Sequence, residues 1–385
     1  MTVHRRAIVV SAALLTATAL PGSVRVASAA AEAPSGAWVT GYYPSSELSH
    51  LPPDKIDFRA ITHLVYLALL PNADGSLDDQ TEQFASGAIA ARDAAHKAGK
   101  KVLVCIGGSE TGKRFVPAIH GDARAALIRN LVHWTTTNGY DGVDIDMEPV
   151  EPANAEDFQA FIRELRAGLR AADPKMLLTC AAQDFSPNVY LPIQDQFDQI
   201  NIMTYAWVGD YFGTTWYDAA LYNRKNIPYV GNGAPATDPK GPPPPLPSVD
   251  YYIKDWLSRG FTPGRIGIGT AFYAPIWHGA TGPGQPLTGV KLGGEQSYAE
   301  LMQRHYPKEA FHWDDDAHAP YVSLTAPEKM FIVYDDERVC REKIDFLHKN
   351  HLGGIIIWEI GQDYRPDQPA GKQHPLLQAI YEAKP

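Results

Sequence analysis

The stretch Gly139-Tyr-Asp-Gly-Val-Asp-Ile-Asp-Met-Glu-Pro149 combines a short apolar run with several acids. Every second position is hydrophobic, at Val143, Ile145 and Met147, and this is the side-chain period of a β-strand. The opposite face of the strand carries three acidic residues, Asp144, Asp146 and Glu148. Carboxylates aligned on one strand face cost free energy, because they cannot all ionise easily away from bulk water. This arrangement indicates a functional site.

The rest of the chain repeats one theme, in which a short apolar run is followed by a loop and a longer amphipathic segment. With Gly142–Glu148, the predicted strands are Trp38–Tyr43, Ile61–Leu70, Lys101–Ile106, Met176–Ala181, Gln199–Tyr205, Arg265–Phe272 and Gly354–Glu359. The predicted helices are Phe84–Ala98, Ala123–Asn138, Ala155–Ala171, Asp250–Arg259 and Arg338–Asn350. Eight strands that alternate with helices and are apolar on both faces predict an α/β fold, the (β/α)8 TIM barrel. A doubly wound open sheet is the alternative.

The interval from His278 to Tyr334 is too long for one crossover connection. It contains a predicted helix, Ser297–His305, and two predicted strands, Ala319–Leu324 and Lys329–Tyr334. We therefore expect a small α+β insertion between strand seven and strand eight. The predicted organisation is a signal peptide at 1–31, a first barrel part at 36–277, the insertion at 278–334 and the last barrel part at 335–383.

The N-terminal segment has the order of a secretory signal peptide. Basic residues at Arg5 and Arg6 precede an apolar run from Ala7 to Leu20, and small residues follow. The apolar run is short for a membrane span, so we expect a secreted protein with no stable membrane insertion. The Arg5-Arg6 pair also permits a twin-arginine export route.

The composition narrows the class of partner. The formal net charge is -10, and removal of residues 1–31 would take away three arginines and no acid. Such a chain has no basic surface for nucleic acid or anionic membranes, so a neutral substrate is expected. The three cysteines, Cys105, Cys180 and Cys340, fit no zinc motif and are interpreted as small core residues, although a Cys105–Cys180 disulfide is possible.

In a barrel of this type the active site lies at the carboxyl ends of the strands. Glu148 ends its strand and should emerge at the barrel mouth, with Asp146 and then Asp144 deeper inside. A general acid needs a pKa raised toward the working pH, which burial and a neighbouring negative charge can provide. The alternatives are a structural hydrogen-bond network or a divalent cation site, and no histidine stands nearby in a ligand spacing.

Other predicted strand ends are aromatic: Tyr42, Tyr205, Trp207, Tyr273 and Trp358. One aromatic residue at a strand end usually belongs to the core. Several around one mouth, beside an acid pair, are typical of stacking platforms for sugar rings, which have apolar faces and polar rims.

Together these residues resemble the family 18 glycoside hydrolases of the bacterial chitinase type. The most specific match is Asp141-Gly-Val-Asp144-Ile-Asp146-Met-Glu148, which is similar to that family's signature on strand four. Supporting matches are Cys105-Ile-Gly-Gly108, Met203-Thr-Tyr205, Phe272-Tyr273 and Gly353-Gly-Ile-Ile-Ile-Trp358-Glu. The stretch His312–Tyr321 followed by Tyr334-Asp-Asp336 resembles those enzymes' insertion domain.

The resemblance implies a retaining hydrolase of N-acetylglucosamine-containing glycans in which the 2-acetamido group of the substrate is the nucleophile. Glu148 would protonate the glycosidic oxygen, Asp146 would orient the acetamido group, Asp144 would share a proton with Asp146, and Tyr205 would hydrogen-bond the acetamido carbonyl. The residues implied in substrate binding are Trp358, Met203, Tyr42, Tyr273, Trp207 and Asp141. We expect neither a metal nor a cofactor, and a monomeric protein.

The chain also departs from the family pattern. Ala206 and Pro275 stand where many members carry an aspartate and an arginine, Ala68 replaces a common aromatic residue, and Cys105 replaces a serine. These changes leave the substrate open between chitin and other glycans. The alternatives are an endo-β-N-acetylglucosaminidase acting on glycoprotein or cell-wall glycans, and a non-catalytic chitin-binding lectin of the same fold.

Overall fold

The computed structural model describes residues 36–78, 82–224, 227 and 245–384. The proposed signal peptide lies outside these residues. Eight parallel strands form the barrel: β1 (Trp38–Pro44), β2 (His63–Pro71), β4 (Lys101–Gly108), β5 (Gly142–Met147), β6 (Leu177–Ala182), β7 (Gln199–Ile202), β8 (Ile266–Ala271) and β14 (Gly354–Trp358). Pairing of β1 with both β2 and β14 closes the sheet, and β3 (Leu77–Asp78) adds an antiparallel edge to β2. The prediction of a TIM barrel is confirmed.

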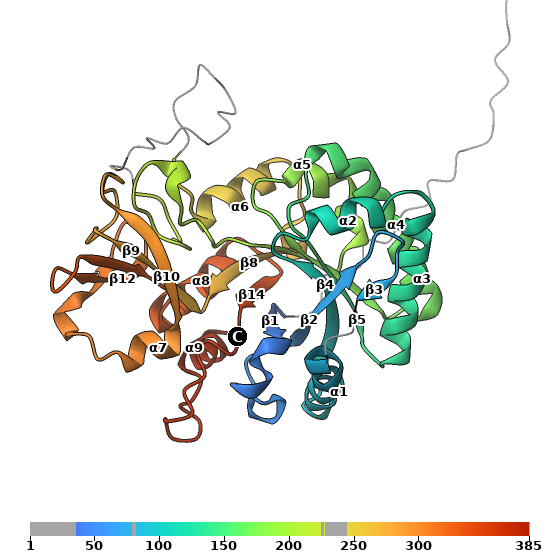
Figure 1. Ribbon diagram of the computed structural model, residues 1–385, viewed down its shortest axis with the longest axis horizontal. Coiled ribbons are helices and arrows are strands. Elements are labelled where there is room, and N and C mark those ends of the chain that lie inside the picture. Colours follow the sequence, from blue (N-terminus) through green and yellow to red (C-terminus); the bar gives the residue numbers. More distant parts are fainter. Residues whose placement is uncertain (1–35, 79–81, 225–226, 228–244, 385) are drawn as a thin grey trace, which may run out of the picture. The chain divides into compact units, whose positions relative to one another are not determined.

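Helices surround the strands (Figure 1). The longer ones are α1 (Glu82–Lys97), α3 (Gly121–Thr137), α4 (Ala155–Ala172), α6 (Val249–Ser258), α8 (Glu337–Lys349) and α9 (Pro375–Ala383). Short helices are α2 (Gly112–Ala118), α5 (Pro187–Tyr190) and α7 (Tyr298–Gln303). The 3₁₀ turns are Ser45–Ser49, Pro53–Lys55, Pro152–Asn154, Leu191–Gln196, Asp210–Phe212, Pro263–Arg265 and Lys308–Ala310. Ser248 caps α6 by accepting a hydrogen bond from the Tyr251 N–H.

A second, antiparallel sheet follows β8 in the chain. Its order is β10-β9-β13-β12-β11, with β9 (Tyr273–His278), β10 (Lys291–Ser297), β11 (Phe311–Asp314), β12 (Ala319–Leu324) and β13 (Met330–Val333). The sequence predicted β12, β13 and α7 but missed the other three strands. The sheet also begins at Tyr273, before the predicted boundary at His278, because β9 follows β8 after a single residue and resembles its continuation.

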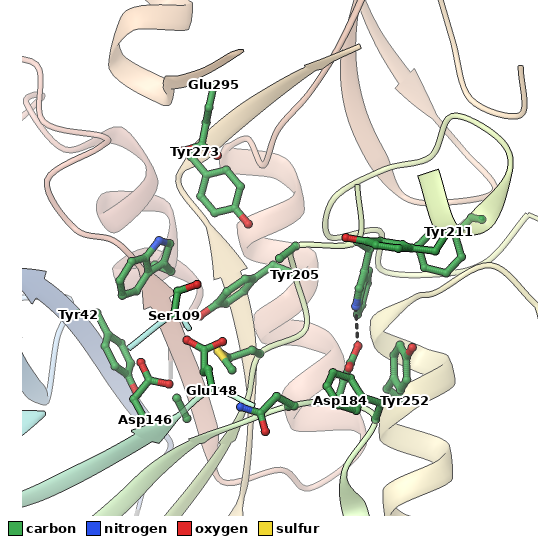
Figure 2. Close-up of a pocket in the computed structure, with 18 of the residues that line it drawn as sticks. Tyr42, Ser109, Asp146, Glu148, Asp184, Tyr205, Tyr211, Tyr252, Tyr273 and Glu295 are labelled. Carbon is green, nitrogen blue, oxygen red and sulfur yellow. Dashed lines mark hydrogen bonds between the residues drawn. The ribbon is translucent and has the colours of Figure 1, made fainter. Parts of the chain in front are cut away.

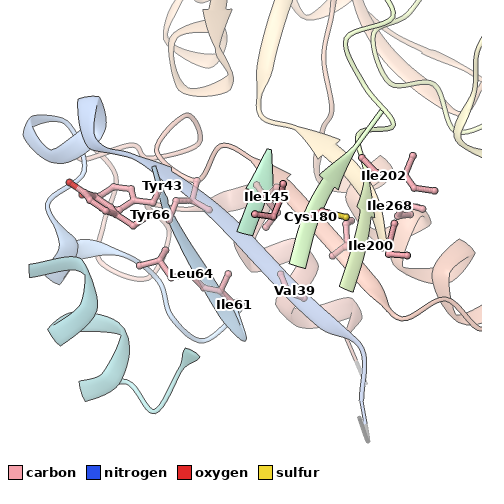
Figure 3. Close-up of a cluster of buried hydrophobic side chains, with 14 of the residues drawn as sticks. Val39, Tyr43, Ile61, Leu64, Tyr66, Ile145, Cys180, Ile200, Ile202 and Ile268 are labelled. Atoms are coloured by element: carbon pink, nitrogen blue, oxygen red, sulfur yellow. The ribbon is translucent and has the colours of Figure 1, made fainter. Parts of the chain in front are cut away.

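The core is divided by the barrel wall. Outward-facing side chains such as Val39, Ile145, Cys180 and Ile268 pack beneath the helices (Figure 3). Inward-facing side chains, among them Tyr42, Leu103, Cys105 and Ile356, form a smaller cluster inside the barrel. All three cysteines are buried and free. Cys105 and Cys180 belong to different clusters on opposite faces of the sheet, so the possible disulfide between them is absent.

Strand β5 shows the predicted alternation. Val143, Ile145 and Met147 belong to the outer core, whereas Asp144 and Asp146 face the barrel interior. Within the described part of the chain, no helix is both long and apolar enough to cross a membrane.

Candidate active site

A cleft of about 840 Å³ lies over the carboxyl ends of the barrel strands. Its lining combines carboxyl groups with aromatic side chains, and it includes Asp146, Glu148, Tyr205 and Trp358 (Figure 2). The second sheet contributes Tyr273 and Glu295 to the same lining. Such an open cleft, with few polar groups among apolar rings, is typical of a ligand-binding site.

The deepest acid of the line is held in place from both sides. Asp144 is fully buried and accepts hydrogen bonds from the Tyr42 hydroxyl, at 3.0 Å, and from the Thr179 hydroxyl. Burial raises the pKa of Asp144 to about 6, and the two hydrogen bonds oppose that rise. Asp144 therefore lies beneath the cleft as a fixed, easily protonated carboxyl group.

Asp146 and Glu148 form the next pair. Asp146 is 3% exposed, its side chain hydrogen-bonds Glu148, and its Oδ1 has no partner within the described residues. Burial raises the pKa of Asp146 well above its ordinary value, and the charges of Glu148 and Asp144 add to the effect. Burial also raises the pKa of Glu148. Two coupled carboxyl groups of this kind share a proton over a broad pH range.

Backbone contacts fix the chain on both sides of Glu148. The Glu148 carbonyl accepts a 2.7 Å hydrogen bond from the Gly112 N–H. The Gln183 amide donates to the Met147 carbonyl at 2.8 Å and accepts from the Val150 N–H at 3.2 Å. The segment around Glu148 is thus anchored to the residue that follows β6 and to the start of α2.

Aromatic rings surround the acid pair. The Tyr42 and Trp358 ring centroids are 5.9 Å apart, and Tyr205 meets Tyr273 edge-to-face at 6.4 Å. Gly269 leaves room for the Tyr205 ring, since a Cβ atom at this position would lie 2.6 Å from it. These rings present both flat faces and hydroxyl groups to the cleft, which suits a ligand with apolar faces and polar edges.

The family model for Glycosyl hydrolases family 18 matches residues 39–363. The chain belongs to this family. Chitinase B of Serratia marcescens is 24% identical over 330 residues, covering 70% of this chain and 66% of that protein. Chitinase A1 of Niallia circulans is 27% identical over 294 residues, covering 68% of this chain and 40% of that protein. The chain thus spans less than two thirds of the length of these relatives.

Solved structures share the family 18 fold. The Group IV chitinase of Ostrinia furnacalis in complex with allosamidin has a TM-score of 0.75 and 20% identity, covering 90% of this chain and 98% of that one. A family 18 N-acetylglucosaminidase from Paenibacillus barengoltzii has a TM-score of 0.72 and 23% identity, covering 90% and 99%.

One departure from the family 18 pattern changes the wall behind Tyr205. Ala206 adopts a left-handed φ of 63°, and its N–H donates a 3.1 Å hydrogen bond to Asp218. Asp218 is buried, also hydrogen-bonds the Tyr273 hydroxyl, and has a pKa raised to about 7 by burial. It does not line the cleft. Asp218 therefore stabilises the aromatic wall of the cleft from its outer side, through Ala206 and Tyr273.

Sequence reasoning missed part of the lining of this family 18 cleft. The additional residues include Ser109, Gln183, Asp184, Phe185, Tyr211, Tyr252 and Glu295. Gln183 and Asp184 directly follow β6, so the strand-end rule could have identified them. Tyr252 lies on α6 and Glu295 on β10, and no sequence signal linked these elements to the mouth.

Asp141 lies apart from the other predicted binding residues. It lies at the start of β5, where it pairs with Lys101 at 2.6 Å and His96 at 2.8 Å and accepts from the Val102 N–H. It does not line the cleft. Its hydrogen bonds join β5 to β4 and α1, and this position favours a structural role over the predicted contact with substrate. The other predicted binding residues, Trp358, Met203, Tyr42, Tyr273 and Trp207, all line the cleft.

Among the described residues, no group of three histidine, cysteine or acidic side chains is arranged to hold a metal ion. The arrangement of Asp144, Asp146 and Glu148 suits proton transfer.

Proposed function

We propose that this protein hydrolyses β-1,4 linkages between N-acetylglucosamine residues in chitin or chitooligosaccharides, with retention of the anomeric configuration. The observation that carries the proposal is the hydrogen-bonded Asp146–Glu148 pair at the floor of an aromatic cleft. Secretion through residues 1–31 and a monomeric state belong to the same proposal. So does an insertion between β8 and α8, predicted over 278–334, whose sheet begins at Tyr273.

The mechanism begins with the proton on the Asp146–Glu148 pair. Glu148 donates it to the glycosidic oxygen as the bond to the anomeric carbon breaks, and the acetamido carbonyl oxygen of the same sugar forms the new bond. The leaving sugar departs as an alcohol, and an oxazolinium ion remains. Glu148, now ionised, then removes a proton from the water that opens this ring.

Asp146 acts while the positively charged oxazolinium ion forms. When Asp146 turns from Glu148 toward the acetamido N–H, its carboxylate orients the amide and stabilises the positive charge. Its unpartnered, buried Oδ1 supports this role, because a nearby donor would relieve the cost of desolvation. Tyr205 would hold the acetamido carbonyl oxygen, and Trp358 would lie beneath the sugar ring.

Digestion of an N-acetylglucosamine hexamer, followed by mass spectrometry and NMR, tests the proposal. Products with the β-anomer formed first are expected. The Glu148→Gln variant should lose about 10³-fold in kcat while it still binds the hexamer, because a general acid contributes on this scale. The exposed Glu151→Gln variant is the matched control. Unchanged turnover in Glu148→Gln would refute the assignment.

The same assay separates the alternative substrates. Ala206 and Pro275 motivate a comparison with glycopeptides and peptidoglycan. If those glycans are cleaved while the N-acetylglucosamine hexamer is not, the result would favour an endo-β-N-acetylglucosaminidase or a cell-wall hydrolase. Hexamer binding without any product would favour a lectin.

A further inference from the structure

The cleft is lined by acidic groups without a basic counterpart. Its lining includes Asp146, Glu148, Asp184 and Glu295, and no lysine, arginine or histidine of the described chain lines it. Asp146 and Glu148 hydrogen-bond each other, and Asp184 accepts from Trp207 and Tyr252. Glu295 differs from these three, because the described residues offer it neither a hydrogen bond nor an ion pair. Its carboxylate is therefore available to a ligand.

The position of Glu295 results from an irregularity in the second sheet. Leu292 pairs with Trp277 and Glu295 pairs with Pro275, so β10 contains one residue more than β9 over this interval. Gly294 absorbs the extra residue with a φ of 81°. In an uninterrupted ladder, Glu295 would lie opposite Ala274 and point to the other face of the sheet.

The residue across the strand from Glu295 provides no charge. Directly opposed side chains in an antiparallel pair are close enough to interact, and an opposite charge there would stabilise the carboxylate. Pro275 occupies this position. Tyr273 lies on the same wall and points into the cleft, with Glu295 beyond it on the side away from Asp146 (Figure 2). Partial burial raises the pKa of Glu295 above its ordinary value.

We propose that Glu295 is a specificity residue that binds the ammonium group of a glucosamine unit, so that the preferred substrate is a partly deacetylated N-acetylglucosamine polymer. This inference rests on the proposed function, since the sugar above Glu148 must keep its acetamido group and the glucosamine occupies a neighbouring position along the cleft. The acidic lining equally disfavours glycans with carboxylated sugars, because like charges repel.

The test uses defined hexamers that are fully acetylated or contain glucosamine. The wild-type protein should cleave the mixed hexamers with the higher kcat/KM. In Glu295→Gln, which keeps a hydrogen-bonding side chain without the charge, this preference should fall about five-fold, the scale of one solvent-accessible ion pair. Glu309→Gln, an exposed acid of the same insertion, should retain the preference.

Two further experiments test whether the negative charge of Glu295 causes the preference. Pro275→Arg places a cation opposite Glu295 and should abolish the preference without a loss of activity on the fully acetylated hexamer. Raising the ionic strength to about 0.5 M should weaken the wild-type preference, because salt screens charges that are accessible to solvent.

Binding measurements keep this inference separate from the proposed function. Titration of mixed and fully acetylated hexamers into Glu148→Gln, with and without Glu295→Gln, reports the same preference without hydrolysis. If Glu295→Gln weakens both ligands equally, or neither, the inference is overturned while cleavage of the acetylated hexamer still stands. If mixed hexamers bind more tightly but nothing is cleaved, the inference holds and the proposed function fails.

Discussion

The indole Nε1 of Trp207 donates a 2.6 Å hydrogen bond to the carboxylate of Asp184. This bond joins the loop after β7 to the loop after β6, and Tyr252 stacks on Trp207 with ring centroids 5.5 Å apart. The Asp184 carbonyl also accepts from the Trp256 indole at 2.7 Å. Asp184 is therefore a positioning residue for one aromatic wall of the cleft (Figure 2).

Two replacements of Asp184 should distinguish the effect of its hydrogen bond to Trp207 from the effect of its charge. Asp184→Asn keeps an acceptor for Trp207, whereas Asp184→Leu leaves a buried N–H without a partner and should cost about 1–3 kcal/mol in the free energy of unfolding. The leucine variant should also raise KM for oligosaccharides more than it lowers kcat. Urea unfolding and steady-state kinetics measure both effects. Equal stability and KM in the two variants would contradict this role.

Substitution of Tyr42 should shift the acid limb of the pH profile of kcat/KM. Its hydroxyl donates to Asp144 and favours the ionised carboxylate, so its removal in Tyr42→Phe should raise the pKa of Asp144 above its present value of about 6. Protonation then begins at a higher pH, and the acid limb of kcat/KM should move upward. Tyr43→Phe is the control, because the Tyr43 hydroxyl bonds the Leu51 carbonyl on the other face of the sheet. An unmoved limb in Tyr42→Phe would show that Asp144 does not govern it.

Stability should decrease as the pH rises. Burial raises the pKa of Asp184 and Asp218 to about 7 and that of Glu359 to about 8, against ordinary values of 3.8 and 4.5. Between about pH 4 and 8, the folded protein therefore keeps protons that the unfolded chain has already released. Linkage then requires the free energy of unfolding to fall as the pH rises through this window. The Tm should be highest near its acidic end.

Glu359→Gln should make this decline shallower, since it removes the group with the highest raised pKa among the three. Thermal unfolding between pH 4 and 9 measures the slope, and Glu309→Gln should leave it unchanged. A wild-type Tm that rises steadily from pH 4 to 8 would contradict the protonation states inferred here.

Two neighbouring glycines at the end of β4, Gly107 and Gly108, should differ in how well they tolerate substitution by alanine. A Cβ atom at Gly107 would lie 2.1 Å from the Asp146 carbonyl oxygen, whereas nothing lies within 4 Å at Gly108. Both have positive φ, so alanine at either position should introduce backbone strain of about 1–3 kcal/mol. Gly107→Ala must also displace the strand end that carries Asp146 and Glu148, so it should lose more stability and more kcat. Indistinguishable variants would argue against this close packing.

Much of the architecture could be predicted because it depends on local pattern. The period of two along β5 separated Val143 and Ile145 from Asp144 and Asp146, and the structure confirms both faces. The strand-end rule likewise identified Tyr205 and Trp358, which line the cleft. These predictions needed only the side-chain alternation and the known polarity of a barrel.

Other features depend on contacts between distant segments. Asp141 has the same chemistry as its neighbours on β5, and only its position at the strand entrance, beside Lys101, removes it from the cleft. Strand β10 contains Gly293-Gly294 and an irregular register, so it lacks the alternation by which strands are recognised. For this reason neither the second sheet in full nor the position of Glu295 in the cleft lining could be inferred from the sequence.

The second sheet is one continuous excursion of the chain, from Tyr273 to Val333, between β8 and α8. The acids proposed to react, Asp146 and Glu148, and the side chain proposed to select the glycan, Glu295, thus lie in separate segments of the chain. A chimera that exchanges this excursion between relatives should transfer the proposed charge preference, while the proposed proton donor, Glu148, stays with its own barrel.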